Sequence, residues 1–578
     1  MKIDLDLMAT TFTDVEFFVA CVGADAAPAF SCPHPSSLAV TNDPNFWAVT
    51  SRVRSTGQSL VNQVGFASIL FRGYEAGLSV HSYSAAAERE RLAAPDKLTN
   101  GVFAYLKFDC TTKQAVIRSD AFGVAPLFYR RSGAAWLFGS HPGLLHFTGD
   151  QVDLNAWLSM LQSGQMLGEQ SFYSEIARFP AGTQMTINGS YEVLERWFSF
   201  AELPYGNQPI DDSTFETVEN AYRSSMDRCL RLDLEEKTLP LSSGYDSRRF
   251  LGTLVQRNVA FHAVTCQTFH RKNGRDYDID AHFAPKMAAA FGVPCELIAA
   301  VPIDCIAGDV QRREALIGTE TFDHDWAVPL MRWLGTRPPS MVFDGLGGDT
   351  FGNSGFEING LHESPEKDVD LLVNHAAKPY LFRLLSSRFL RLAEYKATYR
   401  NYLVQFPSNL NRAELAFLQS RTRRGISPWI TMMHPPGHVV VFPYFDIEFA
   451  QATLSFHPAE KYKWFLQKEC LRRWYPDFFD FPGTRNLPKD YAPLPLAISL
   501  ARKREVDGYL YGELSTIIGS LRYLSLPNKV LLILAKVFPI LRKRLDWLFK
   551  PLLSLVTTKR HAKVFLEREV VSSAKGVS

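Results

Sequence analysis

Two loops that combine glycines with aspartates are the strongest candidates in this sequence for a ligand-binding or catalytic site. The first lies in TLPLSSGYDSRRFLGTL (238–254), between an apolar run and a second apolar run of helical period. Backbone N–H groups in such a strand–turn–helix junction bind anions such as phosphate, and serine hydroxyls add donors. The candidate phosphate-binding residues are Ser242, Ser243, Gly244, Asp246 and Ser247.

Asp246 changes what this loop can bind. A carboxylate repels a bare phosphate, so an acid here favours a divalent cation between the two groups. The alternative for this loop taken alone is a well-capped helix start with no ligand. The next residue but one, Arg248, is an unusual cation at a helix N-terminus. It is expected either to contact phosphate or a substrate carboxylate, or to be an exposed arginine.

A second loop, in MVFDGLGGDTFGNSG (341–355), repeats the combination of glycines and an acid after an apolar run. Two such loops at the ends of parallel strands would supply Asp246 and Asp349 as a pair of Mg²⁺ ligands, which suits nucleoside triphosphate chemistry. A flexible surface turn is the alternative for the second loop alone. The candidate nucleotide-binding residues of the second loop are Gly345, Gly347 and Gly348.

The elements around these loops fall into three regions. Residues 1–205 contain short apolar or alternating runs separated by turn residues, which predicts an α+β region with antiparallel sheet. Residues 206–505 alternate strands and helices and then become mostly helical, which predicts an α/β region with a parallel sheet. Residues 506–578 form a tail of different composition.

Bulk composition narrows the class of protein. The 578 residues are too many for one core, and a net charge of +2 gives no argument for nucleic acid as a partner. Eight cysteines are scattered without a C-x-x-C pair, which favours reduced thiols and a cytoplasmic location. The first residues are too polar for a secretory signal, and no apolar run reaches the ~18 residues of a membrane span.

The order of motifs resembles the asparagine synthetase-like ATP-dependent ligases. Residues 242–247 resemble that family's S-G-G-x-D-S, with Ser243 in place of the first glycine, and 345–350 resemble G-E-G-x-D-E. Further along, FPYFD (442–446) resembles P-F-L-D, and KWFLQ (463–467) resembles K-x-x-L-R with Gln467 for the arginine. The segment from Asp280 to Gly292 resembles D-x-x-x-A-x-x-V-A-x-x-L-G, and TRNLPKDY resembles a basic segment whose catalytic lysine would be Lys489.

The resemblance implies a fold and an activity. The first region would be an Ntn-type antiparallel sandwich like the glutamine amidotransferase half, and the second a PP-loop adenine-nucleotide α-hydrolase-like domain with a helical C-terminal part. With ATP and Mg²⁺, such a ligase adenylates a small-molecule or peptide carboxylate and joins it to an amine or ammonia, releasing AMP and pyrophosphate. Asp246, Asp349 and Lys489 would be catalytic, adenine would lie near 265–268, and a homodimer is left open.

Three departures limit the resemblance. The family's glutaminase nucleophile is a cysteine after the initiator methionine, whereas this chain has Lys2; Cys21 lies inside an apolar run. We therefore predict a degenerate glutaminase with no nucleophile. Leu346 and Thr350 replace two acids of the second loop, and Asp344 stands just before it. Two alternatives stay open: an asparagine synthetase proper, dependent on ammonia or glutamine, and a nucleotide-binding pseudoenzyme partner in a biosynthetic cluster.

The tail adds one more prediction. Its segment 526–563 interleaves Leu, Phe and Trp with many basic residues against the single acid Asp546. That pattern fits an amphipathic segment at a membrane surface or against a partner, and the alternative, which is favoured, is a helical appendage that packs on the rest of the chain. Under the first interpretation the protein would be membrane-associated through this tail.

Overall fold

The structure is a computed structural model of the chain. The predicted tail, 506–578 with its segment 526–563, lies outside the described residues. The residues described are 2–3, 8–9, 12, 14–23, 29–30, 36–52, 60–76, 91–147, 149–151, 153, 155–156, 159–160, 165–189, 191–232, 234–272, 275–300, 316, 327–356, 358–377, 392–484 and 486–501.

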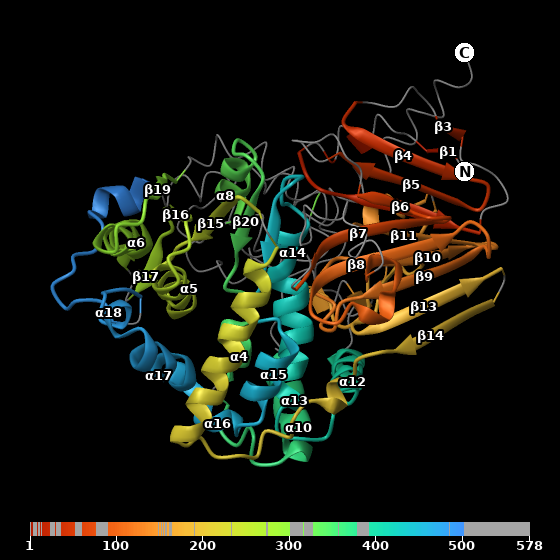
Figure 1. Cartoon of the computed structure of the whole chain (residues 1–578). Helices are drawn as coiled ribbons and strands as arrows, with labels where there is room; N and C mark the ends of the chain where they lie inside the picture. The colour runs from red at the N-terminus through yellow and green to blue at the C-terminus, as the bar shows by residue number, and fades with distance from the viewer. Residues whose placement is uncertain are drawn as a thin grey trace, which may run out of the picture.

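The N-terminal region is a sandwich of two antiparallel sheets (Figure 1). The first sheet has the order β12 (Ala177–Arg178), β10 (Phe128–Ser132), β11 (Ala135–Gly139), β2 (Phe18–Val22), β5 (Phe46–Ser51), β4 (Leu38–Asp43). The second has the order β14 (Tyr191–Arg196), β13 (Thr183–Asn188), β9 (Gln114–Ser119), β8 (Gly101–Asp109), β7 (Ala67–Glu75), β6 (Val61–Val64). Apolar side chains fill the space between them, and the rings of Phe46 and Phe108 stack across it at 5.2 Å. The predicted antiparallel sheet is confirmed.

The second region contains a five-stranded sheet in which every neighbouring pair is parallel. Its order is β19 (Cys295–Ile298), β16 (His262–Cys266), β15 (Glu236–Pro240), β20 (Ser340–Phe343), β21 (Val439–Val441). Helices connect the strands, because a parallel pair needs a crossover. They are α5 (Tyr245–Gln256), α6 (Ile279–Ala290) and α8 (Ala327–Leu334), and α4 (Asp212–Leu230) precedes the sheet. The predicted parallel sheet is confirmed.

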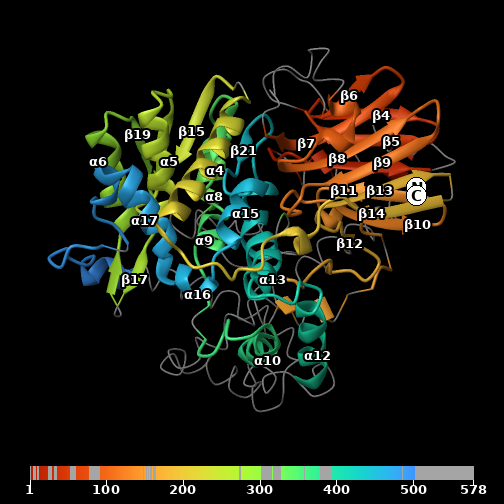
Figure 2. The ribbon, with the colours of Figure 1, turned by 60° about the horizontal axis from the view of Figure 1, so that its bottom comes forward.

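Helices dominate the chain beyond residue 347. Three consecutive helical segments lie between the parallel sheet and the sandwich (Figures 1 and 2). They are α13 (Arg412–Phe417), the π-helix η5 (Leu418–Ile426) and α14 (Ser427–Thr431). The other helices are α9 (Gly348–Phe351), α10 (Pro365–Ala376), α12 (Leu392–Leu403), α15 (Ile447–Leu454), α16 (Pro458–Lys461), α17 (Phe465–Trp474) and α18 (Pro476–Phe479). In none of the described helices is a stretch both long and apolar enough to cross a membrane.

The sandwich and the parallel-sheet region share buried contacts. The Phe442 N–H, at the end of β21, donates to the Tyr74 hydroxyl at 2.8 Å, and the Ile447 N–H donates to Asn100 Oδ1 at 3.0 Å. Arg72 of β7 forms an ion pair with Glu16 and also donates to the Thr431 carbonyl of α14. These contacts fix how the two regions are placed relative to one another.

Candidate functional site

The two predicted loops meet at the switch point of the parallel sheet. From β15 the chain moves outward through β16 to β19, and then returns to the other side of β15 for β20 and β21. In sheets of this kind the crevice at the carboxyl ends of the strands where the order reverses is the usual ligand site. The first loop (242–247) follows β15 and the second loop (344–350) follows β20, so both border that crevice.

Glycines of the second loop lie directly against Asp246. A Cβ built at Gly348 would lie 2.6 Å from Asp246 Oδ1, and one at Gly345 would lie 3.1 Å from Asp246 Cβ. Gly347 has a φ of +95°, which favours glycine, and a Cβ there would lie 3.0 Å from the Phe445 ring. The glycines of the second loop therefore make room for the carboxylate of the first.

Serine hydroxyls hold the first loop in shape. Ser247 Oγ donates to the Ser242 carbonyl at 2.9 Å and accepts the Ser242 N–H at 3.1 Å, while Ser242 Oγ accepts the Gly244 N–H at 3.2 Å. Gly244 is the N-cap of α5, with an extended φ of −77°, so its role is close approach and not a positive φ. It offers no side-chain cap to the first turn of α5, a position at which anions can bind.

Ser243 has a different partner from the predicted phosphate. Its N–H and its hydroxyl both donate to Asp280 Oδ1, at 2.7 and 2.6 Å, and Asp280 Oδ2 lies 2.9 Å from His270 Nε2. Burial alone would raise the pKa of Asp280, but hydrogen bonds from His270 and Ser243 outweigh it and lower the pKa to about 2. A serine at this position thus ties the loop to the start of α6.

Both expectations for Arg248 are wrong, because its side chain is neither exposed nor directed at a ligand. The side chain is fully buried, and burial lowers its pKa to about 10. Its guanidinium instead satisfies a group of backbone carbonyls at the end of α18 and in the first loop. The acceptors are the carbonyls of Ser243, Phe478, Phe479, Phe481 and Pro482.

The segment that carries Lys489 is docked on the first loop. The Thr484 N–H donates to Ser243 Oγ at 3.3 Å, and the Tyr491 hydroxyl donates to Asp278 at 2.8 Å. Lys489 itself is exposed and makes no hydrogen bond or ion pair with another described residue. Its catalytic role therefore stays a prediction.

The second loop carries three features relevant to charge. Asp349, at the start of α9, is exposed, and Leu346 is buried. The Leu346 N–H donates to Asp344 Oδ1 at 2.8 Å. Burial and, to a smaller extent, the nearby Asp349 raise the pKa of Asp344 to about 6, against the opposing effect of the Leu346 N–H. The pKa of the Asp344 carboxyl thus lies closer to neutral pH than that of an ordinary aspartate.

Gln467 was noted in the sequence only as a replacement for an arginine, but the structure places it at the meeting point of the loops. Its side chain is buried, and Nε2 makes no hydrogen bond with any described residue. A Cβ at Gly348 would lie 2.8 Å from this nitrogen and 2.6 Å from Asp246 Oδ1. An amide here supplies a donor without the positive charge of arginine.

Asp246 and Asp349, the two predicted metal ligands, lie on adjoining loops. Among the residues that the structure describes, no three His, Cys, Asp or Glu side chains converge as a metal site. The close approach of Asp246 to Gly345 and Gly348 fits the Mg²⁺ interpretation, in which two carboxylates and the substrate phosphates complete the shell.

The described cysteines do not have the properties of a catalytic nucleophile. Lys2 lies in the two-residue strand β1 (Lys2–Ile3), which pairs with β3 (Ala29–Phe30). Cys21 is fully buried in β2, and burial raises its pKa to about 12. Burial likewise raises the pKa of the other described thiols, those of Cys110, Cys229, Cys266, Cys295 and Cys470. A nucleophilic cysteine needs the opposite shift.

Comparison with known proteins bears on the sandwich. Residues 93–198 match the family model of the glutamine amidotransferase domain, a stretch that holds β8 to β14. That match, together with the antiparallel sheets, confirms the predicted amidotransferase-like part. The match ends before the parallel sheet begins, so it does not test the predicted ligase part.

Solved structures give a weaker likeness. One is a glutamine phosphoribosylpyrophosphate amidotransferase from B. subtilis complexed with ADP and GMP, at 14% identity and a TM-score of 0.21, with 60% of this chain and 73% of that chain covered. Another is the allosteric regulatory enzyme of purine biosynthesis, at 12% identity and a TM-score of 0.21, with 64% and 75% covered. No curated protein matches the chain. The chain thus contains a region similar to a glutamine amidotransferase domain, joined to a parallel sheet with two acidic loops.

Proposed function

We propose that this chain is an ATP-dependent ligase that adenylates a carboxylate and transfers the acyl group to a nitrogen nucleophile, without hydrolysing glutamine. The observation that carries the proposal is the contact between Asp246 and the glycines of the second loop at the switch point. An acid there, faced by backbone that only glycine permits, suits a cation shared with a polyphosphate.

Residues of the two loops divide the work of the first step. A carboxylate oxygen of the substrate forms a bond to the α-phosphorus of ATP, and the bond from that phosphorus to the β-bridging oxygen breaks. The loop of Ser242, Gly244 and Ser247 and the start of α5 would hold the departing pyrophosphate. Asp246 and Asp349 would hold Mg²⁺, which when bound neutralises charge on the phosphates.

The second step needs a proton acceptor. The amine nitrogen attacks the acyl carbon, the bond from that carbon to the AMP oxygen breaks, and the nitrogen loses a proton. Leu346 cannot take this proton, whereas Asp344 has a pKa raised to about 6 by burial and is fixed by the Leu346 N–H. A base works best with a pKa near the working pH, so we assign this role to Asp344. Lys489 would stabilise charge during acyl transfer.

The carboxylate substrate is proposed to be something other than free aspartate. A buried leucine at position 346 offers no charge to an ammonium group, and Gln467 offers an amide where the resemblance implies a cation. The raised pKa of each described thiol supports ammonia or an amine, and not glutamine, as the nitrogen source.

Pyrophosphate release with ATP, Mg²⁺ and a panel of amino acids, dipeptides and small organic acids tests the proposal. We expect release that depends on one carboxylate class and falls by about 100-fold or more in Asp246→Asn, because the metal loses a charged ligand. Asp370→Asn, an exposed acid on α10 paired with Arg400, is the control and should keep full activity.

Two results would contradict the proposal. Binding of MgATP without pyrophosphate release for any member of the panel would favour the nucleotide-binding pseudoenzyme. Release of glutamate from glutamine would show that a glutaminase is present and would favour an asparagine synthetase proper.

A further inference from the structure

The π-helix η5 touches both the sandwich and the second loop. Nine residues long, it is buried along most of its length, although its sequence LQSRTRRGI includes three arginines. π-helical turns are rare and occur frequently at functional sites. Its contacts on the two sides show what a buried, arginine-rich helix does here.

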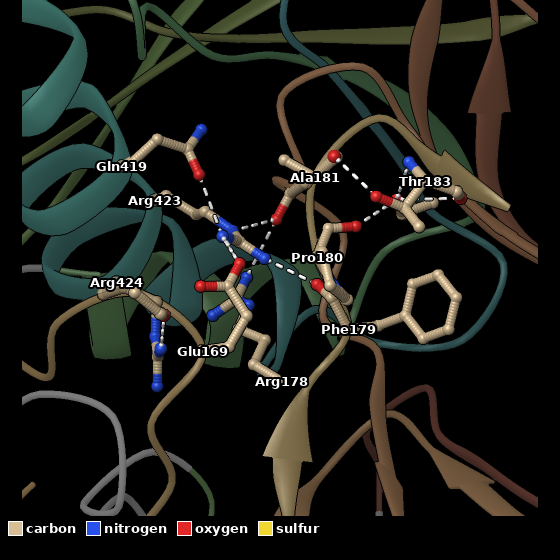
Figure 3. Close-up of polar contacts among 12 residues, drawn as sticks. Glu169, Arg178, Phe179, Pro180, Ala181, Thr183, Gln419, Arg423 and Arg424 are labelled. Atoms are coloured by element: carbon tan, nitrogen blue, oxygen red, sulfur yellow. Dashed lines mark hydrogen bonds and ion pairs between the residues drawn. The ribbon is translucent and has the colours of Figure 1, made fainter. Parts of the chain in front are cut away.

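On one side, η5 is fastened to backbone carbonyls of the sandwich (Figure 3). Arg423 donates from Nε to the Gly123 carbonyl at 2.8 Å and from Nη2 to the Phe179 carbonyl at 2.7 Å. Arg424 donates from Nη2 to the Gln170 carbonyl at 2.7 Å. Because carbonyls lie on the main chain, these bonds fix the position of the π-helix against the backbone of the sandwich.

The sandwich presents a rigid turn to this helix. In the turn at 120–125, Asp120 accepts the N–H groups of Phe122, Val124 and Ala125 at 2.9–3.1 Å. Gly123 has a φ of +64°, and a Cβ there would lie 2.9 Å from the guanidinium of Arg423. The turn therefore has no spare room in which Arg423 could shift.

On the other side, η5 and the same turn reach the second loop. The hydroxyls of Thr422 and Thr350 are hydrogen-bonded at 2.9 Å, and Thr350 directly follows Asp349. The Phe122 ring contacts the rings of Phe351 and Phe445, with centroids 5.5 and 5.6 Å apart. Phe445 in turn lies against Gly347, so the loop is held at both ends.

We propose that the amidotransferase-like sandwich positions the Asp349 loop, through the turn at 120–125 and η5, with Gly123 and Thr422 as positioning residues. The contacts of the first loop lead elsewhere, to Asp280 and to the end of α18. The consequence for catalysis rests on the proposed ligase activity, whereas the coupling between sandwich and loop does not.

Amide hydrogen exchange on the full chain tests the coupling. The N–H groups of Gly348, Thr350, Phe351 and Gly352 bond to carbonyls inside the second loop, so their exchange reports its opening. We expect Gly123→Ala and Thr422→Val to speed exchange at these amides by about tenfold, the effect of losing about one buried hydrogen bond. Exchange at Ser243, in the first loop, should not change.

Each variant has a matched control. Gly133→Ala also places alanine at a positive φ, +62°, but nothing lies within 4 Å of its Cβ. Thr431→Val also removes a buried hydroxyl, one that bonds only within its own helix, to Ser427. Both controls should leave second-loop exchange within about twofold of wild type. Equal exchange in Gly123→Ala and wild type, or equal effects in variants and controls, would overturn the proposal.

The kinetic arm separates this proposal from the ligase assignment. If the loss of the Thr422 hydroxyl displaces Asp349, Thr422→Val should lower kcat for pyrophosphate release and raise the Mg²⁺ concentration at half-maximal rate. KM for the carboxylate should not change. Thr422→Ser should restore kcat and the Mg²⁺ dependence to wild-type values. A kcat unchanged in Thr422→Val would overturn the catalytic consequence. A wild type that releases no pyrophosphate would end the ligase assignment, and the exchange result would still decide the coupling.

Discussion

The loop after β15 and the loop after β20 end at the same edge of the same sheet, yet different parts of the chain hold them. Polar side chains fix the first loop from within the parallel-sheet region: Asp280 at the start of α6, and Arg248, which joins the loop to the end of α18. The second loop is held by glycine backbone against Asp246 and by contacts that lead through η5 to the sandwich.

This difference suggests that contacts of the first loop stabilise the fold, whereas contacts of the second loop position a carboxylate. Removing a partner of the first loop leaves buried polar groups unsatisfied, which destabilises the fold. A Cβ added in the second loop should displace the Asp246 carboxylate, and a small displacement of a reacting group slows chemistry. The predictions below test that contrast.

Arg248→Met should have the largest effect. The substitution keeps the volume of the stem but leaves five buried or partly buried carbonyls without their donor, so we expect a loss of about 3–5 kcal/mol in the free energy of unfolding. Urea unfolding measures it. Arg472→Met, at an exposed arginine paired with Glu469, is the control. A change of less than about 1 kcal/mol would show that water replaces the guanidinium.

Gly348→Ala should act on activity and not on stability. Its Cβ would lie 2.6 Å from Asp246 Oδ1, so the carboxylate must move, and we expect about 100-fold slower pyrophosphate release. Gly244→Ala is the matched change in the first loop, where the Cβ would meet only Ser242 Oγ, at 3.2 Å. Equal losses of activity in the two variants would remove the contrast between the loops.

Asp280→Asn should lower stability in a pH-dependent way. The folded pKa of about 2 lies below the ordinary 3.8, so ionised Asp280 stabilises the fold above about pH 4, and this stabilisation is lost as pH falls towards 2. The shift corresponds to about 2 kcal/mol. Unfolding curves of wild type and variant should therefore differ at pH 7 and converge near pH 2. A gap independent of pH would mean that the charge of Asp280 contributes nothing.

The parts that the sequence predicts are the local ones. The strand–turn–helix pattern and the glycine-acid combination identified both loops, because each signal lies within about 15 residues. The partners of those loops are not local: Ser243 bonds to Asp280, 37 residues away, and Arg248 to Phe478, 230 residues away. The available signals for Asp280 were its place at the start of the helix after β16 and the D-x-x-x-A match that begins with it.

The π-helix was beyond prediction for a physical reason. Three arginines in nine residues indicate an exposed segment, since charged side chains are seldom fully buried unless paired. Here backbone carbonyls of the sandwich, more than 250 residues earlier in the chain for Gly123, satisfy Arg423. Composition alone cannot reveal acceptors that belong to the main chain of a distant turn.

Asp344→Asn should have the smallest effect and the opposite sign. Burial and Asp349 raise the folded pKa of Asp344 to about 6, above the ordinary 3.8, so wild type loses stability as pH rises from about 4 to 6. Asparagine keeps an acceptor for the Leu346 N–H without the charge, so the variant should be about 1–2 kcal/mol more stable at pH 8 and no more stable at pH 4.

Thermal unfolding at these two pH values measures the gain, and a variant less stable than wild type at pH 8 would contradict it. Pyrophosphate release should fall in the same variant if Asp344 accepts the proton of the attacking amine. A carboxyl whose removal stabilises the fold and slows the reaction is placed for chemistry and not for folding. Asp280 should show the reverse, because its charge is used to hold the first loop.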